Sequence, residues 1–239
     1  MKHLIKHLIL SLALLSNLAT AQDFTATSWV IADYKGKIID GENWDEVRPI
    51  ASISKLMAVM TVIDAGQDLE ERIGPHTRLE LIYLSIVHSD NQATVRLCEH
   101  YPGGKSACVR AMNDKARKFG LEHTRFAEPT GLSVFNVSTA DELVTIVLEA
   151  SRYPLIVEAS RMGKVEIKRR KRVTAFNNTN PITRKRDDVI VSKTGYIRAS
   201  GGCLVMMVDT DLGKRILVIL NSKSTRTRIP DAEYLLAKY

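Results

Sequence analysis

The 239-residue sequence has little of what metal centres and membrane-spanning proteins require. It contains three cysteines and six histidines. The four histidines after residue 21, at positions 76, 88, 100 and 123, and the cysteines show no H-x-x-x-H or C-x-x-C spacing, which argues against a metal site. No run after residue 21 approaches the roughly 20 apolar residues of a membrane-spanning helix. No segment rich in proline, glycine and serine divides the chain, and no internal repeat is present. The sequence therefore predicts no metal ion or other cofactor, and no multidomain or repeat organisation.

The N-terminus carries the pattern of an export signal. Two lysines precede an apolar run over residues 8–18, and residues 19–21 read Ala-Thr-Ala, the A-x-A pattern that signal peptidases accept. The apolar run is too short to span a bilayer. We therefore predict a signal peptide over residues 1–21, cleaved after Ala21, a periplasmic location, and a single domain over residues 22–239.

The charge balance is moderately basic. The formal net charge is +7 at pH 7, and loss of Lys2 and Lys6 with the signal peptide would lower it to +5. Such an excess is compatible with attraction to an anionic cell-wall polymer, whereas export argues against nucleic acid as a partner. The basic run from Lys168 to Arg172 is typical of a solvated strand or loop face.

Three short motifs occur once each and in a fixed order: Ser52-Ile53-Ser54-Lys55, Ser89-Asp90-Asn91 and Lys193-Thr194-Gly195. They match the S-x-x-K, S-D-N and K-T-G set of penicillin-binding proteins and class A β-lactamases. Taken singly, each has a more ordinary explanation, such as a helix N-cap, a solvated lysine, a polar turn or a strand end. Their joint occurrence in this order, behind an export signal, indicates an active-site serine acyltransferase.

The first motif supplies a nucleophile and a base. An apolar helical pattern starts at Ser52, and one helical turn brings Ser52 and Lys55 to the same face. A serine hydroxyl needs a neighbouring base, and both burial and a second cation, Lys193, would lower the pKa of Lys55 toward neutrality. We therefore predict that Ser52 attacks and that Lys55 is the base, with backbone N–H groups at the helix start available to an oxyanion.

The other two motifs supply groups that can hold a substrate. The hydroxyl of Ser89 and the amide of Asn91 can pass a proton and bind a substrate amide. Lys193 and Thr194, at a strand end, can bind a carboxylate, and Gly195 lets the backbone approach the substrate closely. The aspartate between Ser89 and Asn91 is expected to bond within its own turn.

The secondary-structure pattern places strands at both ends of the chain and helices between them. Strands are expected at 29–34, 37–40, 164–174, 189–193, 202–208 and 214–220, and helices at 52–65, 79–88, 92–100, 106–119, 138–152 and 231–239. Strands from the two ends can share one sheet. The predicted class is therefore α+β, with a helical subdomain inserted over about residues 66–160.

The cysteines allow one disulfide and leave one thiol over. Cys98 and Cys108 lie symmetrically about Pro102-Gly103-Gly104, between two predicted helices. An oxidising compartment would permit a bridge between them, but spacing alone leaves the pairing open. Cys203 stands in an apolar run and is expected to be a small buried side chain.

Five further segments extend the pattern beyond the motifs: 101–104, 124–133, 136–141, 178–180 and 202–206. With the motifs they resemble the serine DD-carboxypeptidase family, and within it the small penicillin-binding D-alanyl-D-alanine endopeptidases. The resemblance implies a β-lactamase/transpeptidase-like fold, with an antiparallel sheet flanked by helices. It also implies cleavage of D-alanyl bonds in peptidoglycan stem peptides through an acyl-enzyme, and covalent inhibition by β-lactam antibiotics.

The resemblance also assigns roles and shows two departures. It implies that Ser89 relays the proton to the leaving amine and that the backbone N–H groups of Ser52 and Tyr196 form the oxyanion hole, without a metal. Family members often carry threonine where this chain has Ile197, which removes a hydroxyl for the substrate carboxylate. The interval of 37 residues from Ser52 to Ser89 suggests a more open cleft. No stable membrane anchor is expected.

These observations favour a DD-endopeptidase, with a D-alanyl-D-alanine carboxypeptidase as the alternative. A β-lactamase is less favoured, because its water-activating glutamate has one candidate here, Glu128, and the family resemblance already explains the segment around it. A catalytically inactive wall-binding protein is disfavoured by the intact motifs. The expected partners are peptidoglycan stem peptides and, as inhibitors, β-lactams.

Overall fold

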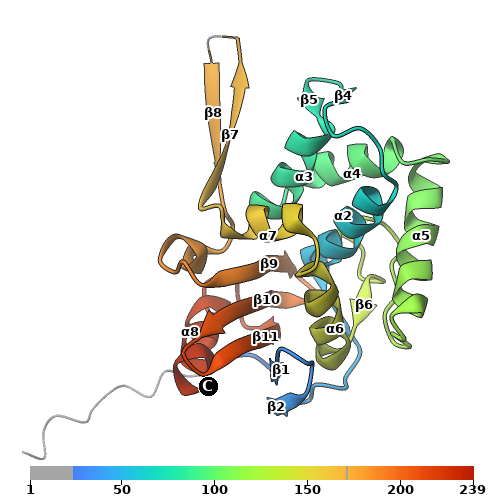
Figure 1. The fold of residues 1–239 in the computed structure, drawn as a ribbon. Coiled ribbons are helices and arrows are strands. Elements are labelled where there is room, and N and C mark those ends of the chain that lie inside the picture. Colours follow the sequence, from blue (N-terminus) through green and yellow to red (C-terminus); the bar gives the residue numbers. More distant parts are fainter. Residues whose placement is uncertain (1–23, 171) are drawn as a thin grey trace, which may run out of the picture.

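A computed structural model describes residues 24–170 and 172–239. The predicted signal peptide therefore lies outside the described residues. Five strands form one antiparallel sheet in the order β2-β1-β11-β10-β9 (Figure 1). Their bounds are β1 Ser28–Asp33, β2 Ile38–Glu42, β9 Val189–Ile197, β10 Gly201–Thr210 and β11 Gly213–Ser222. Strands from both ends of the chain thus share the sheet, as the sequence predicts.

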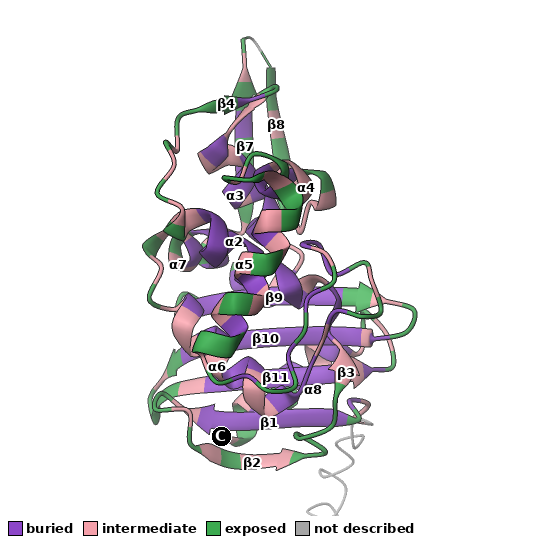
Figure 2. Ribbon diagram, turned by 90° about the vertical axis from the view of Figure 1, so that its right-hand side faces the viewer, coloured by how far each residue is buried: buried purple, intermediate pink, exposed green. Residues whose placement is uncertain are grey.

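Helices cover both faces of this sheet. In β10, every second residue faces the same core cluster. Cys203, Val205 and Met207 belong to one cluster, and Leu204, Met206 and Val208 belong to the other. Successive side chains of a strand point to opposite faces, so a sheet covered on both sides needs apolar residues at nearly every position. Helix α8 packs on one face, and α6 and α7 pack on the other (Figure 2).

The helices and the shorter strands complete the α+β architecture. The helices are α2 Ser54–Asp64, α3 Arg78–Val87, α4 Asn91–Glu99, α5 Gly104–Lys118, α6 Ala140–Ala150, α7 Pro154–Arg161 and α8 Arg228–Lys238, with 3-10 turns η1 Ala51–Ile53 and η2 Pro181–Arg184. The remaining strands pair in twos: β3 Arg48–Pro49 with β6 Val137–Ser138, β4 Arg72–Ile73 with β5 His76–Thr77, and β7 Lys164–Arg169 with β8 Arg172–Asn177. Over the described residues, no helix is long and apolar enough to cross a membrane.

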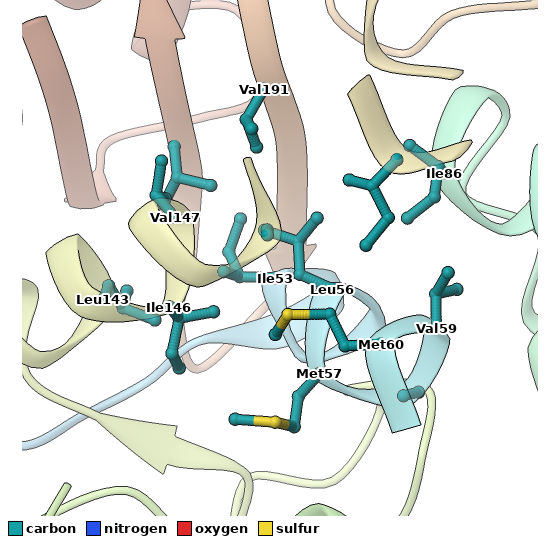
Figure 3. Packing of buried hydrophobic residues seen from close by; sticks show 14 of the residues in the cluster. Ile53, Leu56, Met57, Val59, Met60, Ile86, Leu143, Ile146, Val147 and Val191 are labelled. Atoms are coloured by element: carbon teal, nitrogen blue, oxygen red, sulfur yellow. The ribbon is translucent and has the colours of Figure 1, made fainter. Parts of the chain in front are cut away.

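Helix α2 occupies the centre of the larger core. Its residues from Ser54 to Val62 are all buried, and Figure 3 shows Leu56 and Met60 among side chains of α3, α6 and β9. A helix that is apolar all round is expected to be enclosed by the protein. The predicted helix is therefore present, but its first turn is the 3-10 turn η1, so Ser52 precedes α2 instead of starting it.

A disulfide joins helices α4 and α5. Cys98 and Cys108 are bonded, with their Cα atoms 5.4 Å apart. The pairing that the sequence leaves open is thus present in the structure. Cys203 is a free and buried thiol, as expected for its apolar run.

Three elements differ from the sequence-based expectation. The strand predicted at 164–174 is the hairpin β7–β8, because the chain turns at Arg170, which adopts φ +48°. Helix α6 is capped by Thr139, whose Oγ1 accepts a hydrogen bond from the Glu142 N–H, so the cap is one residue later than predicted. Helix α7, which starts at Pro154, was not predicted.

Candidate active site

The three motifs meet where η1, the turn after α3 and strand β9 converge. Ser52 lies in η1, Ser89 lies between α3 and α4, and Lys193 lies within β9. The two lysines of the motifs, Lys55 and Lys193, are both almost completely buried, with exposed fractions of 0% and 1%. Ser52 and Ser89 are only partly buried, so their hydroxyls remain available to a substrate.

Lys55 makes hydrogen bonds that leave one position for the Ser52 hydroxyl. Its Nζ donates to Ser52 Oγ at 2.9 Å, to Asn91 Oδ1 at 2.7 Å and to the Thr130 carbonyl oxygen at 2.6 Å. The two carbonyl-type oxygens can only accept. A neutral amine has two N–H bonds and one lone pair, so the oxygens of Asn91 and Thr130 take both hydrogens. The lone pair then faces Ser52 and can accept its proton.

The pKa of Lys55 suits this role. Burial lowers the pKa of Lys55 from 10.5 to about 7, and the charges of Glu128 and Asp90 oppose that shift only in part. A general base is most effective when its pKa lies near the working pH and it is within about 3.2 Å of the proton it takes. Both conditions are met by Lys55 and Ser52.

Lys193 and Ser89 form a second hydroxyl–amine pair. Lys193 Nζ donates to Ser89 Oγ at 2.8 Å and to the Thr194 carbonyl oxygen at 2.8 Å. Burial, followed by the charges of Lys55 and Arg228, lowers the pKa of Lys193 well below its usual value. Ser89 adopts φ +59°, a conformation that is costly for a residue other than glycine and that concentrates at functional sites. The pair can pass a proton through the Ser89 hydroxyl.

The aspartate of the second motif has the structural role that the sequence suggests. Asp90 is the N-cap of α4, and its Oδ1 accepts a hydrogen bond from the Ala93 N–H at 2.8 Å. Such caps satisfy one of the free N–H groups at a helix start. Asp90 thereby fixes the helix that carries Asn91.

Close backbone approaches place the Ser52 N–H beside the end of β9. A Cβ atom at Gly195 would lie 3.0 Å from the Ser52 nitrogen, and one at Gly131 would lie 1.9 Å from the Ala51 carbonyl oxygen. Only glycine fits at Gly131, and a side chain at Gly195 would push the neighbouring backbone aside. Tyr196, next in β9, has a side chain that is 49% exposed, so this end of the strand opens to solvent.

Two threonines and one arginine complete the β9 side of the site. The hydroxyls of Thr194 and Thr179 are 2.6 Å apart. Arg228, the first residue of α8, is only 7% exposed, and its Nη1 donates to the Gly195 carbonyl oxygen at 2.7 Å. Arg228 was not predicted, because one arginine among 34 lysines and arginines carries no local signal. It adds positive charge beneath the third motif.

Glu128 shapes the loop that presents Thr130 to Lys55. Its carboxylate accepts hydrogen bonds from the Thr130 N–H at 2.7 Å, the Thr130 hydroxyl at 2.6 Å and the Gly131 N–H at 2.6 Å. Burial would raise the pKa of Glu128, but the hydrogen bonds from Thr130, Ser133 and Gly131 outweigh it and lower the pKa. The carboxylate is therefore engaged within its own loop, which identifies Glu128 as a positioning residue for Lys55.

Replacing Glu128 with glutamine should lower the rate of acylation by a fluorescent penicillin about 10- to 100-fold, because small displacements of a catalytic group have effects of that size. Since the Glu128 charge raises the pKa of Lys55, its loss should also move the acid limb of the pH–rate profile to lower pH. The second-order acylation rate measured against pH tests both effects. If the acid limb of the pH–rate profile stayed at the same pH, Glu128 would not act on the pKa of Lys55.

Metal-ligating residues do not gather in this part of the molecule. Within residues 24–170 and 172–239, no group of three or more His, Cys, Asp or Glu side chains is arranged to hold a metal ion. The motifs contribute two hydroxyl–amine pairs, Ser52 with Lys55 and Ser89 with Lys193, and the Asn91 amide, which is bonded to Lys55.

Comparison with protein families and curated sequences shows that the similarity extends well beyond the three motifs. A family model described as D-alanyl-D-alanine carboxypeptidase matches residues 16–77 and 71–224. A D-alanyl-D-alanine endopeptidase of Escherichia coli K12 is 36% identical over 91% of this chain and 78% of its own length. A D-alanyl-D-alanine endopeptidase of Pseudomonas aeruginosa PAO1 is 34% identical over 92% and 79%, respectively.

Solved structures with low sequence identity share the fold. Penicillin-binding protein D2 from Listeria monocytogenes, in its ampicillin-bound form, is 23% identical and superposes with a TM-score of 0.81, over 89% of this chain and 96% of that one. The Streptomyces K15 DD-transpeptidase is 20% identical, with a TM-score of 0.82 over 90% and 96%. These matches confirm the predicted fold class.

Proposed function

The chain belongs to the D-alanyl-D-alanine carboxypeptidase family of serine peptidases, and we propose that it is a DD-endopeptidase that cleaves D-alanyl bonds in peptidoglycan crosslinks through an acyl-enzyme on Ser52. One observation carries the proposal. Lys55 Nζ lies 2.9 Å from Ser52 Oγ, while Asn91 and Thr130 occupy its other two positions. This arrangement makes a buried amine the base for one particular hydroxyl.

In the proposed acylation, neutral Lys55 takes the proton of Ser52 as Oγ attacks the D-alanyl carbonyl carbon. The negative charge that develops on the carbonyl oxygen is stabilised by the backbone N–H groups of Ser52 and Tyr196. The amide bond then breaks, and the leaving amine receives a proton through the Ser89 hydroxyl, which Lys193 holds at 2.8 Å. Water subsequently hydrolyses the ester and restores Ser52.

The remaining motif residues are proposed to hold the substrate. Asn91 and the Thr194 hydroxyl would bind substrate amide and carboxylate groups, and Gly195 lets the substrate backbone lie against β9. The buried Arg228 guanidinium, which donates to the Gly195 carbonyl oxygen, makes this end of β9 positive, and that favours an anionic group nearby. That charge is also the observation that keeps a carboxypeptidase as the second candidate, because a carboxypeptidase must bind a terminal carboxylate.

The proposed cellular setting follows from the N-terminal sequence. Cleavage after Ala21 would leave an enzyme that starts at Gln22 in the periplasm, where its polymeric substrate is located. β-Lactam antibiotics would acylate Ser52 as covalent inhibitors, because their strained amide occupies the place of the D-alanyl bond. No metal or cofactor is required for either reaction.

Crosslinked muropeptide dimers should be converted to monomers faster than D-alanine is released from a pentapeptide monomer. Both reactions acylate Ser52 with the same D-alanyl carbonyl and differ only in the leaving group. Ile197 offers no hydroxyl to a terminal carboxylate, which disfavours the carboxypeptidase reaction, and relatives at 34–36% identity are named endopeptidases. Chromatography of the two digests measures the ratio. Efficient D-alanine release with intact dimers would instead identify a carboxypeptidase.

A further inference from the structure

The hairpin β7–β8 projects from the body of the protein beside helix α3 (Figure 1). Its base is fixed next to the second motif, because the ring of Phe176 packs on His88 at a centroid distance of 5.2 Å and His88 Nδ1 lies 3.1 Å from the Asn177 carbonyl oxygen. His88 directly precedes Ser89. Six residues of strand span about 20 Å, so the hairpin extends from the edge of the active site to a tip about that distance away.

The hairpin is held in place along its inner face. Val165 and Ile167 are only 6% and 4% exposed, and β7 packs against α3. Near the tip, Arg169 donates to Glu80 Oε1 at 2.8 Å and lies 3.0 Å from His76 Nδ1. An isolated two-stranded hairpin is marginally stable in water, so these contacts hold strand β7 against the body of the protein.

Three cations near the tip form no salt bridge with the described part of the chain. Lys168, Arg170 and Arg172 are exposed, and no acidic side chain pairs with any of them among the described residues, whereas Lys164 and Arg169 are paired with Glu166 and Glu80. Like charges at one tip repel one another, and an anionic ligand would relieve that repulsion. The hairpin therefore has the charge and the fixed geometry of an electrostatic docking arm.

We propose that Lys168, Arg170 and Arg172 bind the carboxylates of the peptidoglycan polymer and hold the enzyme on its insoluble substrate. This inference rests on the proposed function, which supplies a polymer whose uncrosslinked stem peptides end in free carboxylates. Because the base of the hairpin adjoins Ser89, the tip lies about 20 Å from the active site. Stem peptides bound at the tip would therefore be close to the crosslink that is bound in the active site. The arm acts on binding to the polymer and not on the chemistry.

The test is cosedimentation of the protein with purified sacculi, in a Ser52→Ala background so that the polymer is not digested. The triple substitution K168E/R170E/R172E should weaken sacculus binding by at least about tenfold, since fields of this kind change association by one to three orders of magnitude. Raising the salt from about 50 to about 300 mM should weaken binding of the parent but have little effect on the variant.

A matched control makes the same change of charge on helix α5, where Lys105, Arg110 and Lys118 are exposed and have no acidic partner within the described chain. K105E/R110E/K118E should bind sacculi like the parent. Equal loss in both variants would show that only net charge matters, and unchanged binding in the hairpin variant would exclude the arm; either result overturns the proposal.

Two further measurements distinguish the arm from the active site and from a membrane. With Ser52 intact, the hairpin variant should be acylated by a fluorescent penicillin at the wild-type rate, and a slower rate would overturn the proposal. Loss of binding to phosphatidylglycerol vesicles with sacculus binding retained would assign the tip to a membrane surface instead. If the wild type cleaved no crosslink, the endopeptidase proposal would fail, whereas the cosedimentation result would stand.

Discussion

Replacing Ser52 with alanine should abolish both covalent labelling by a fluorescent penicillin and cleavage of crosslinked muropeptides. Ser52 is the hydroxyl that faces the Lys55 amine at 2.9 Å, and the other two hydrogen-bonding positions of that amine are occupied by oxygens that only accept. Without the hydroxyl there is no atom in place to form the ester. Gel fluorescence after incubation with the labelled penicillin measures the effect directly.

The control for this experiment is another serine at an exposed position. Ser106, on helix α5, is exposed, and Ser106→Ala should be labelled like the wild type. Circular dichroism of both variants should match the wild type, because Ser52 is only partly buried and Ser106 is exposed. Label that persists on Ser52→Ala would place the nucleophile elsewhere and contradict the assignment of the site.

The sequence predicts which candidate site residues lie near one another better than it predicts their surroundings. The three motifs identify Ser52, Lys55, Ser89, Asn91 and Lys193, and the structure brings all of them together. The reason is that each motif is a local string on one element. The family resemblance and the fold class are confirmed by the family and structure matches.

The contacts that tune the site come from distant parts of the chain and could not be read from local patterns. The Thr130 carbonyl meets Lys55 across 75 positions of sequence, and Arg228 meets Gly195 across 33. A backbone carbonyl has no identity in the sequence at all, and Arg228 is one basic residue among many. Such contacts depend on how the elements pack, which periodicity does not specify.

The hairpin β7–β8 illustrates a local failure of the same reasoning. A single strand is predicted at 164–174 because no glycine, proline, asparagine or aspartate interrupts these residues. The turn falls at Arg170, which adopts φ +48° without the glycine or asparagine that usually marks a left-handed position. The contact of Arg169 with Glu80 stabilises the hairpin from outside its own sequence. Tertiary contact, and not turn chemistry, thus decides this element.

The second large effect is expected at Lys55, where the change from lysine to arginine retains the positive charge but removes the base. A guanidinium does not lose its proton in proteins, so Lys55→Arg should lower the acylation rate about 10²- to 10⁴-fold, the contribution typical of a positioned general base. The exposed Lys105 on α5 supplies the control, and Lys105→Arg should leave the rate unchanged.

The pKa of Lys55 also predicts how the acylation rate changes with pH. The buried Lys55 has a pKa of about 7, and only its neutral form can take the Ser52 proton. The wild-type acylation rate should therefore rise as pH increases through about 7 and level off above it, and it should fall about tenfold per unit well below that value. Lys55→Arg should lack this limb, because its guanidinium stays charged throughout. Stopped-flow acylation from pH 5 to 9 compares the two profiles. A wild-type rate in Lys55→Arg, or the same acid limb in both proteins, would assign the base to another group, for which Lys193 at Ser89 is the nearest alternative.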